Sequence, residues 1–223
     1  MYERCLVAVA HPDDETLGCG GFLKKLSKTG VETMVLTMTD GVSSRMGANE
    51  TQREQRKKNF HTALNLLGVT RQQQFGFPDN QLDSVPLLEI SKIIESTVAD
   101  FKPSIIITHS DADLNQDHRV VSEATKIANR PQPESGVKLF LAAEVLSSSH
   151  WSWNKNSYFA PNYFVDIAEV LDVKIEACKA YDAEMRPWPH ARSIQAIEHL
   201  CKSRGALIGM SAAEAFEVIY QIN

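Results

Sequence analysis

The stretch Ala10-His11-Pro12-Asp13-Asp14-Glu15 decides how this chain of 223 residues is interpreted. It follows the apolar run 5–9, Cys-Leu-Val-Ala-Val, which is typical of a buried strand in a parallel sheet. Glycines and helically spaced apolar residues come directly after it, from Gly18 to Leu26. One imidazole and three carboxylates therefore lie where a strand ends and a helix begins, which is the edge at which ligands bind in open α/β sheets. A metal ion is the simplest explanation for so many ligand atoms at that place.

Size, charge and cysteine usage exclude several classes of protein. The length is enough for one large α/β domain with a substantial core, and a formal net charge of -5 argues against a general nucleic-acid binder. No apolar run approaches the ~20 residues that a membrane-spanning helix needs, and residues 1–4 lead into a strand without a signal-peptide pattern. The four cysteines lie far apart and form no Cys-x-x-Cys pair, so we expect reduced thiols and a cytoplasmic protein.

Predicted strands and helices alternate along the rest of the chain. The strands are expected at 31–39, 73–77, 104–108, 139–146 and 163–167, and the helices at 52–67, 87–101, 117–129, 170–185 and 194–203. This order predicts one α/β domain over residues 1–223, with a Rossmann-like, mostly parallel sheet covered by helices on both faces.

A second polar cluster, His109 to Arg119, follows the Ile-rich strand. Because the carboxyl ends of parallel strands share one edge of a sheet, this cluster can meet the first one. His11, Asp14 and His118 would then form a set of two histidines and one carboxylate, and catalytic zinc typically has three protein ligands and one open position. We expect Asp13 to face the water at that position and to serve as a general base.

Each of these residues also has a plainer interpretation. The first cluster could be a solvated loop that caps a helix, and we expect Asn115 and Asp117 to act partly as helix caps. His109 alone is more often a packed polar residue at a strand end than a ligand. The glycines of residues 18–21 lack the third glycine of a nucleotide-binding loop, because Leu23 occupies that position.

The three tryptophans, Trp151, Trp153 and Trp188, leave two alternatives open. A role in the core or in a subunit contact is favoured for at least one of them. A platform on which a sugar ring stacks is the second alternative.

Taken together, these residues resemble the LmbE-like, or PIG-L, family of zinc-dependent N-deacetylases. The resemblance covers nearly the whole chain in order, through the stretches AHPDDE (10–15), TDG (39–41), DLNQDHR (113–119), FVDI (164–167), 174–181, PHARS (189–193) and AEAF (213–216). It implies that His11, Asp14 and His118 bind Zn²⁺, or another divalent ion, that Asp13 is the general base, and that Asp117 supports the catalytic centre.

Two positions depart from the family pattern. Asn115 stands where many members have a histidine that stabilises the oxyanion; its amide can still donate a hydrogen bond but cannot carry a positive charge. Arg56 resembles an arginine near the substrate pocket of relatives, but Asn59 replaces its usual glutamate partner. His190 and Arg192 are further candidates for substrate binding, with a surface loop as the plain alternative.

The resemblance implies a hydrolase that removes an N-acetyl or other N-acyl group from an amino sugar or glycoconjugate. An amidase that uses the same zinc site on a non-sugar or thiol-conjugate substrate is the alternative. A phosphoesterase is less favoured because such sites usually hold two metal ions, and a non-catalytic nucleotide-binding module is disfavoured by the missing glycine. Members of the family often form homo-oligomers, so a homo-oligomer is a further expectation.

Overall fold

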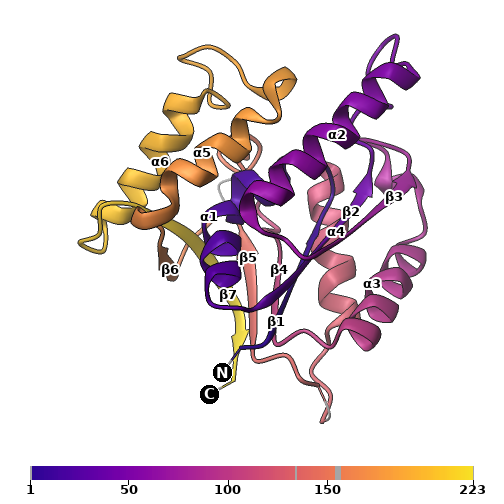
Figure 1. The fold of residues 1–223 in the computed structure, drawn as a ribbon. Coiled ribbons are helices and arrows are strands. Elements are labelled where there is room, and N and C mark those ends of the chain that lie inside the picture. Colours follow the sequence, from indigo (N-terminus) through magenta and orange to yellow (C-terminus); the bar gives the residue numbers. More distant parts are fainter. Residues whose placement is uncertain (1, 134, 154–156, 223) are drawn as a thin grey trace.

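Short apolar runs build the centre of a seven-stranded sheet. The computed structural model describes residues 2–133, 135–153 and 157–222. The strands lie in the order β3-β2-β1-β4-β5-β7-β6 (Figure 1). They are β1 (Arg4–Val9), β2 (Glu32–Thr39), β3 (Arg71–Phe77), β4 (Ile105–His109), β5 (Leu139–Ala143), β6 (Tyr163–Asp166) and β7 (Ala213–Gln221). The first five in this order are parallel, whereas β7 runs antiparallel to both β5 and β6.

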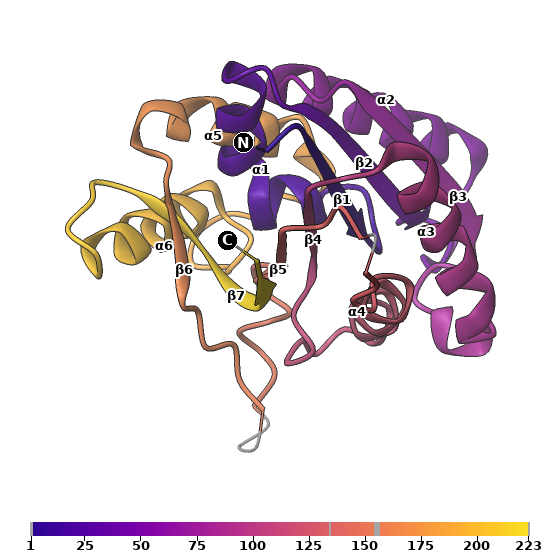
Figure 2. The same cartoon turned by 90° about the horizontal axis from the view of Figure 1, so that it is seen from below.

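Helices cover both faces of the sheet (Figure 2). They are α1 (Asp14–Lys28), α2 (Glu50–Leu67), α3 (Leu87–Phe101), α4 (Gln116–Ala128), α5 (Leu171–Lys179) and α6 (Ile194–Ala206), with short 3₁₀ turns at Leu82–Ser84, Ala168–Val170 and Asp182–Glu184. Successive side chains of β1 point to opposite faces, so Val7 packs in the core under α1, α2 and α5, and Leu6 packs in the core under α3 and α4. The predicted α/β class and mostly parallel sheet are therefore confirmed.

The C-terminal part differs from the sequence-based prediction. The predicted helix 170–185 ends at Lys179, and a separate 3₁₀ turn follows at Asp182–Glu184. The Ala- and Glu-rich segment after Gly209, for which no strand was predicted, forms β7 and pairs with both β5 and β6. Its first half lacks the β-branched residues typical of strands and buries Glu214, so its pattern does not resemble an apolar strand.

Buried Glu214 is stabilised by an ion pair and by the helix beside it. Its carboxylate lies 2.6 Å from Nζ of Lys174, and it accepts two backbone N–H groups, those of residues 21 and 22, at 2.7 Å each. These N–H groups are free to donate because α1 is interrupted at Cys19, where φ is −147°. Lys174 also donates to the carbonyl of Leu17 at 2.8 Å. The pair thus joins α5 and β7 to the middle of α1.

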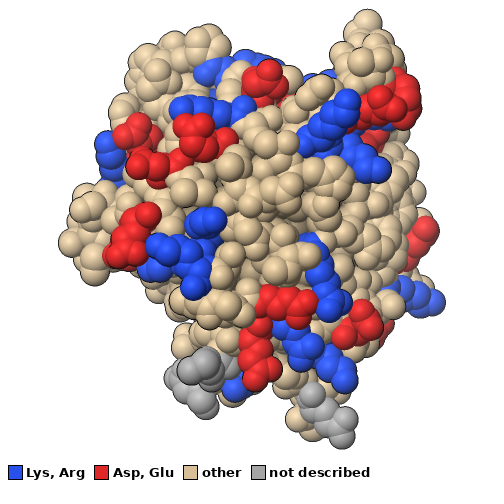
Figure 3. Space-filling view, in the orientation of Figure 1, with Lys and Arg blue, Asp and Glu red and all other residues tan. Residues whose placement is uncertain are grey.

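Basic and acidic side chains are interspersed on the face shown in Figure 3, without a continuous basic patch. Within residues 2–133, 135–153 and 157–222, no helix combines the length and the apolar character that crossing a membrane requires.

Replacing Glu214 by alanine should destabilise the fold strongly. The change leaves the Lys174 ammonium buried without its partner, which typically costs about 3–5 kcal/mol of unfolding free energy. Urea denaturation measures this loss. The control is Glu176→Ala, because the Glu176–Lys179 pair is exposed on both sides and should leave the midpoint unchanged. Equal midpoints for the two variants would contradict the role given to Glu214.

Candidate active site

The two predicted polar clusters meet at the carboxyl ends of β1 and β4. His11 lies in the turn between β1 and α1, and His118 lies in the first turn of α4, shortly after β4. Because β1 and β4 are parallel neighbours in the sheet, their ends lie side by side. The structure therefore brings together side chains that are 107 residues apart in the chain.

Three ligand atoms form a nearly equilateral triangle at this place. Nδ1 of His11 lies 3.3 Å from Oδ2 of Asp14 and 3.2 Å from Nε2 of His118, and the last two atoms are 3.3 Å apart. Metal–ligand bonds of about 2.0–2.1 Å in tetrahedral geometry require separations of about 3.3–3.4 Å between ligand atoms. All three side chains are buried, and the other oxygen of Asp14 has no hydrogen-bond partner among the described residues. This set of donors fits Zn²⁺.

The outer nitrogen of His118 contacts a carboxylate that sequence analysis did not single out. Nδ1 of His118 lies 3.1 Å from Oδ2 of Asp113, which also accepts the hydroxyl groups of Ser148 and Ser149 at 3.0 and 2.6 Å. Metal-binding histidines usually donate their second N–H to such a carboxylate, which fixes the tautomer and the orientation of the ring. The only signal for Asp113 in the sequence is its place five residues before His118 in the DLNQDHR stretch.

His11 has a matching outer contact. Its Nε2 lies 3.2 Å from a carboxylate oxygen of Asp117 and 3.2 Å from one of Asp79, a residue that sequence analysis also missed. The Asp117 carboxylate is itself held by the backbone N–H groups of Asn80 and Leu82 at 2.8 and 2.9 Å. Asp117 therefore contacts His11 on the side away from the triangle of ligand atoms, and its supporting role stays a prediction.

A second set of ligand atoms, from His11, Asp79 and Asp117, also lies close enough together to hold a cation. However, the carboxylate oxygens of this set already accept hydrogen bonds from the protein. The Asp117 oxygens accept the backbone N–H groups described above, and one Asp79 oxygen accepts the Ser44 hydroxyl group at 2.6 Å. With Nδ1 of His11 on a first ion, a second ion on Nε2 would require the imidazole to lose both of its protons. The geometry therefore favours a centre for one ion, oriented by carboxylates around it.

Asp13 has an unusual backbone and two cationic neighbours. Its φ of 113° lies in a region that costs a residue with a side chain about 1–3 kcal/mol. Its Oδ2 atom lies 3.2 Å from Nη2 of Arg56 and 3.0 Å from Nη1 of Arg192. Burial raises the pKa of the Asp13 carboxyl group, and the two guanidinium groups oppose this rise only in part. A raised pKa brings the carboxyl group closer to the range in which it can both accept and return a proton.

Arg56 is buried and has a carboxylate partner other than the one that relatives use. Its Nη1 lies 2.8 Å from Glu184, which also pairs with Arg45 at 2.5 Å. Asn59, at the position of the usual partner, accepts a hydrogen bond from Gln55 instead. Burial favours the neutral form of Glu184, but the arginines outweigh it and lower the pKa of this carboxyl group. Glu184, which no sequence pattern indicated, replaces the missing partner from the distant 3₁₀ turn.

The helix-capping interpretation is confirmed for Asn115 and wrong for Asp117, which lies inside α4 and accepts N–H groups from outside the helix. The side-chain oxygen of Asn115 accepts the backbone N–H of Asp117 at 2.8 Å, and its amide nitrogen donates to the side-chain oxygen of Asn80 at 3.3 Å. One amide N–H of Asn115 is left over from these contacts, since the amide nitrogen carries two hydrogens.

His109 is a packed polar residue at the end of β4, as its plain interpretation expects. Its Nε2 accepts the N–H of Ala10 at 2.9 Å, and its ring stacks on His118 with centroids 3.9 Å apart. Burial and the neighbouring His118 lower the pKa of His109 to about 3, so its ring is neutral.

The tryptophans do not belong to the core. Trp151, Trp153 and Trp188 are 38%, 83% and 56% exposed, so the core interpretation is wrong for all three, and a subunit contact stays a prediction. Trp151 packs edge-on against His190 with ring centroids 5.7 Å apart, and Nδ1 of His190 accepts the backbone N–H of Arg192 at 3.0 Å.

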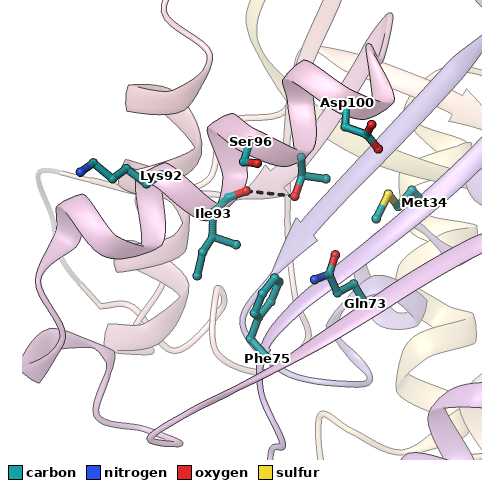
Figure 4. A pocket seen from close by; sticks show the side chains of 8 residues that line it. Met34, Gln73, Phe75, Lys92, Ile93, Ser96 and Asp100 are labelled. Atoms are coloured by element: carbon teal, nitrogen blue, oxygen red, sulfur yellow. Dashed lines mark hydrogen bonds between the residues drawn. The ribbon is translucent and has the colours of Figure 1, made fainter.

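The site opens into a small polar cavity of about 110 Å³. Most of its lining is charged, and comprises His11, Asp13, Gly41, Ser44, Arg45, Arg56, Asp79, Asn80, Glu184 and Arg192. A larger groove of about 440 Å³ lies between α3 and strands β2 and β3 (Figure 4). There the two charged residues, Lys92 and Asp100, are two helical turns apart, so the groove offers no pair of groups for acid–base chemistry.

Replacing Asp113 by asparagine should weaken metal binding. Asparagine keeps the shape of the side chain but removes the charge beside His118, and such outer contacts typically change metal affinity by about 10–100-fold. A titration of Zn²⁺ against a competing chelator measures the effect. Asp111→Asn is the control, because Asp111 is exposed and pairs with Lys126. Equal affinities for both variants would refute the role of Asp113.

Binding of the ion should release protons. Burial favours the neutral ring of His118, but the carboxylates of Asp14 and Asp113 have the larger effect and raise the pKa of His118 to about 9. Neighbouring carboxylates likewise outweigh burial at His11 and raise its pKa. At pH 7 a metal-free preparation therefore holds protons that the ion displaces, so zinc affinity falls as the pH falls below about 9. Calorimetry of zinc binding at pH 7, in buffers with different ionisation enthalpies, should show proton release; a buffer-independent heat would contradict this.

Comparison with known proteins identifies the sequence family. Residues 6–129 match the sequence family described as PIG-L, GlcNAc-PI de-N-acetylase. The diacetylchitobiose deacetylase of Thermococcus kodakarensis is 26% identical over 82% of this chain and 70% of its own length. A probable N-acetyl-alpha-D-glucosaminyl L-malate deacetylase 2 of Bacillus cereus is 27% identical over 82% of this chain and 84% of its own length.

Solved structures show the same fold. The N,N'-diacetylchitobiose deacetylase of Pyrococcus horikoshii superimposes with a TM-score of 0.77 at 21% identity, covering 98% of this chain and 84% of its own. The 4-carboxy-2-hydroxymuconate hydratase GalB of Pseudomonas putida gives 0.78 at 18% identity, covering 99% and 98%. Because the fold alone carries more than one activity, the family rests on the sequence match over more than half of the chain. That match shows that this chain belongs to the PIG-L (LmbE-like) family.

Proposed function

We propose that this protein is a zinc-dependent N-deacetylase that releases acetate from the nitrogen of an amino sugar or glycoconjugate. The observation that carries the proposal is the triangle of His11, Asp14 and His118 ligand atoms, with the Asp13 carboxylate beside it in a polar cavity. The family membership and the names of the relatives support the same reaction.

His11, Asp14 and His118 would hold the ion. Bound there, Zn²⁺ would activate a water molecule and polarise the carbonyl of the substrate amide. Two imidazoles and a carboxylate also suit other divalent ions, and affinity order alone does not decide which of them is bound in a cell.

Asp13 is the group that moves the proton in this proposal. Its carboxylate takes a proton from the attacking water as the oxygen–carbon bond forms, and returns it to the nitrogen as the carbon–nitrogen bond breaks. The products are acetate and the free amine. The pKa of the Asp13 carboxyl group, raised by burial, favours this double use of one carboxylate.

Asn115 is proposed to donate its remaining amide N–H to the oxyanion. Its side chain is held in place by Asp117 and Asn80, so the amide is oriented before substrate binds. A donor of this kind is typically worth about 10²–10³-fold in rate.

Arg56 and Arg192, which line the cavity, are proposed to act on the substrate side, and His190, which is not part of that lining, is proposed to act next to Arg192, whose backbone N–H it accepts. The side chain of Arg192 is 21% exposed and lines the cavity, so it can contact a hydroxyl or anionic group of the substrate. Arg56 is only 6% exposed and is paired with Asp13 and Glu184, so its contribution passes mainly through these partners. A non-sugar or thiol-conjugate amide remains the alternative substrate class.

Two variants separate the roles of base and ligand. Asp13→Asn should keep the ion and lose about 10²–10⁴-fold in kcat, since the proton acceptor is gone. His118→Ala should lose the ion as well as the activity. The measurements are a free-amine assay across N-acetylated amino sugars and non-sugar amides, and elemental analysis of each protein.

The control for these variants is Asp182→Asn, an exposed aspartate of the nearby 3₁₀ turn, which should behave as wild type. Product from non-sugar amides alone would move the substrate to the alternative class. If Asp13→Asn and His118→Ala retained equal amounts of metal, the division of roles would be wrong.

A further inference from the structure

The backbone conformation of Asp13 must be stabilised by contacts with other side chains. Its backbone lies in the left-handed region at φ 113°, ψ −27°, and none of its side-chain atoms caps α1. A residue with a side chain keeps this conformation only where the surrounding contacts determine it.

Glu15 holds the backbone of Asp13. Its Oε2 accepts the Asp13 N–H at 3.0 Å. Its other oxygen, Oε1, accepts two hydroxyl groups, those of Thr16 and Tyr181, each at 2.7 Å. Glu15 is fully buried, so these contacts replace the water that its carboxylate would otherwise bind.

Tyr181 also supports the side chain of Asp13, through Arg56. The Arg56 guanidinium lies 5.0 Å from the centre of the Tyr181 ring, within the usual range of a cation–π contact. The same guanidinium lies 3.2 Å from Oδ2 of Asp13 and donates to the carbonyl of Pro12. Tyr181 thus contacts both groups that fix Asp13: Glu15 with its hydroxyl and Arg56 with its ring.

We propose that Tyr181 and Glu15 are positioning residues that hold the Asp13 carboxylate in the direction its reaction requires. Neither residue lines the cavity, and both are fully buried, so neither is expected to touch the substrate. This inference rests on the proposed function for the identity of the reaction. It goes beyond that function because the rate then depends on a tyrosine 168 residues away in the chain, between α5 and the 3₁₀ turn at Asp182–Glu184.

Tyr181→Phe isolates the contribution of the hydroxyl group, because the ring and its contact with Arg56 remain. We expect kcat to fall about 10–100-fold, the scale typical of a small misplacement of a catalytic group. KM and the metal content per chain should stay unchanged. Tyr163→Phe, on β6 at the far edge of the sheet, is the matched control and should leave kcat unchanged.

A double-mutant cycle distinguishes positioning from simple loss of stability. Glu15→Ala should lower kcat at least as much as Tyr181→Phe, and the double variant should be no slower than Glu15→Ala alone, because both changes break one chain of contacts. Glu15→Gln, which keeps an acceptor for the Asp13 N–H, should recover much of the rate. Additive losses in kcat, or no rescue by glutamine, would overturn the proposal.

Crystal structures of the wild type and Tyr181→Phe test the positioning without reference to the reaction. We expect the Asp13 backbone or carboxylate to shift in the variant while His11, Asp14 and His118 stay in place. An unmoved Asp13 would overturn the positioning role. Absence of any wild-type deacetylase activity would instead reject the proposed function, so the two failures are distinguishable.

Discussion

The parallel pairing of β1 with β4 is the constraint on which the rest of the site depends. It places the turn after β1, with His11 and Asp14, beside the start of α4, with His118. Each turn is rigid for local reasons: Pro12 stiffens the first, and Asn115 caps the second. The three ligand atoms come within 3.3 Å of one another only because both turns leave the same edge of one sheet.

Charge balance explains why so many ionisable groups tolerate burial at this edge. An isolated buried carboxylate is costly, and each one here has a specific partner. Asp113 and Asp117 contact the outer nitrogens of the two histidines, while Asp13 and Glu184 share the guanidinium of Arg56. Oδ2 of Asp14 lies in the triangle of ligand atoms, and its other oxygen, Oδ1, is buried without a hydrogen-bond partner among the described residues, so a cation bound by this carboxylate would complete the balance. Asp13, the proposed proton-transfer group, and His11, Asp14 and His118, the proposed ligands, are thus adjacent but separately paired.

Local patterns in the sequence were enough to predict the sheet class, the parallel strands and the convergence of His11, Asp14 and His118. They could not predict residues whose role depends on distant pairing. No chemical role was predicted for Asp79, Glu184 or Tyr181, and they reach the site only through the fold. Strand β7 was missed because its buried Glu214 is stabilised by Lys174, a contact that no local pattern reveals.

The most direct test of this account is anomalous diffraction at the zinc absorption edge from crystals of the zinc-loaded protein. A single strong peak per chain is expected, within bonding distance of Nδ1 of His11, Oδ2 of Asp14 and Nε2 of His118. A principal peak on other residues, or no peak in a protein that hydrolyses amides, would contradict this expectation.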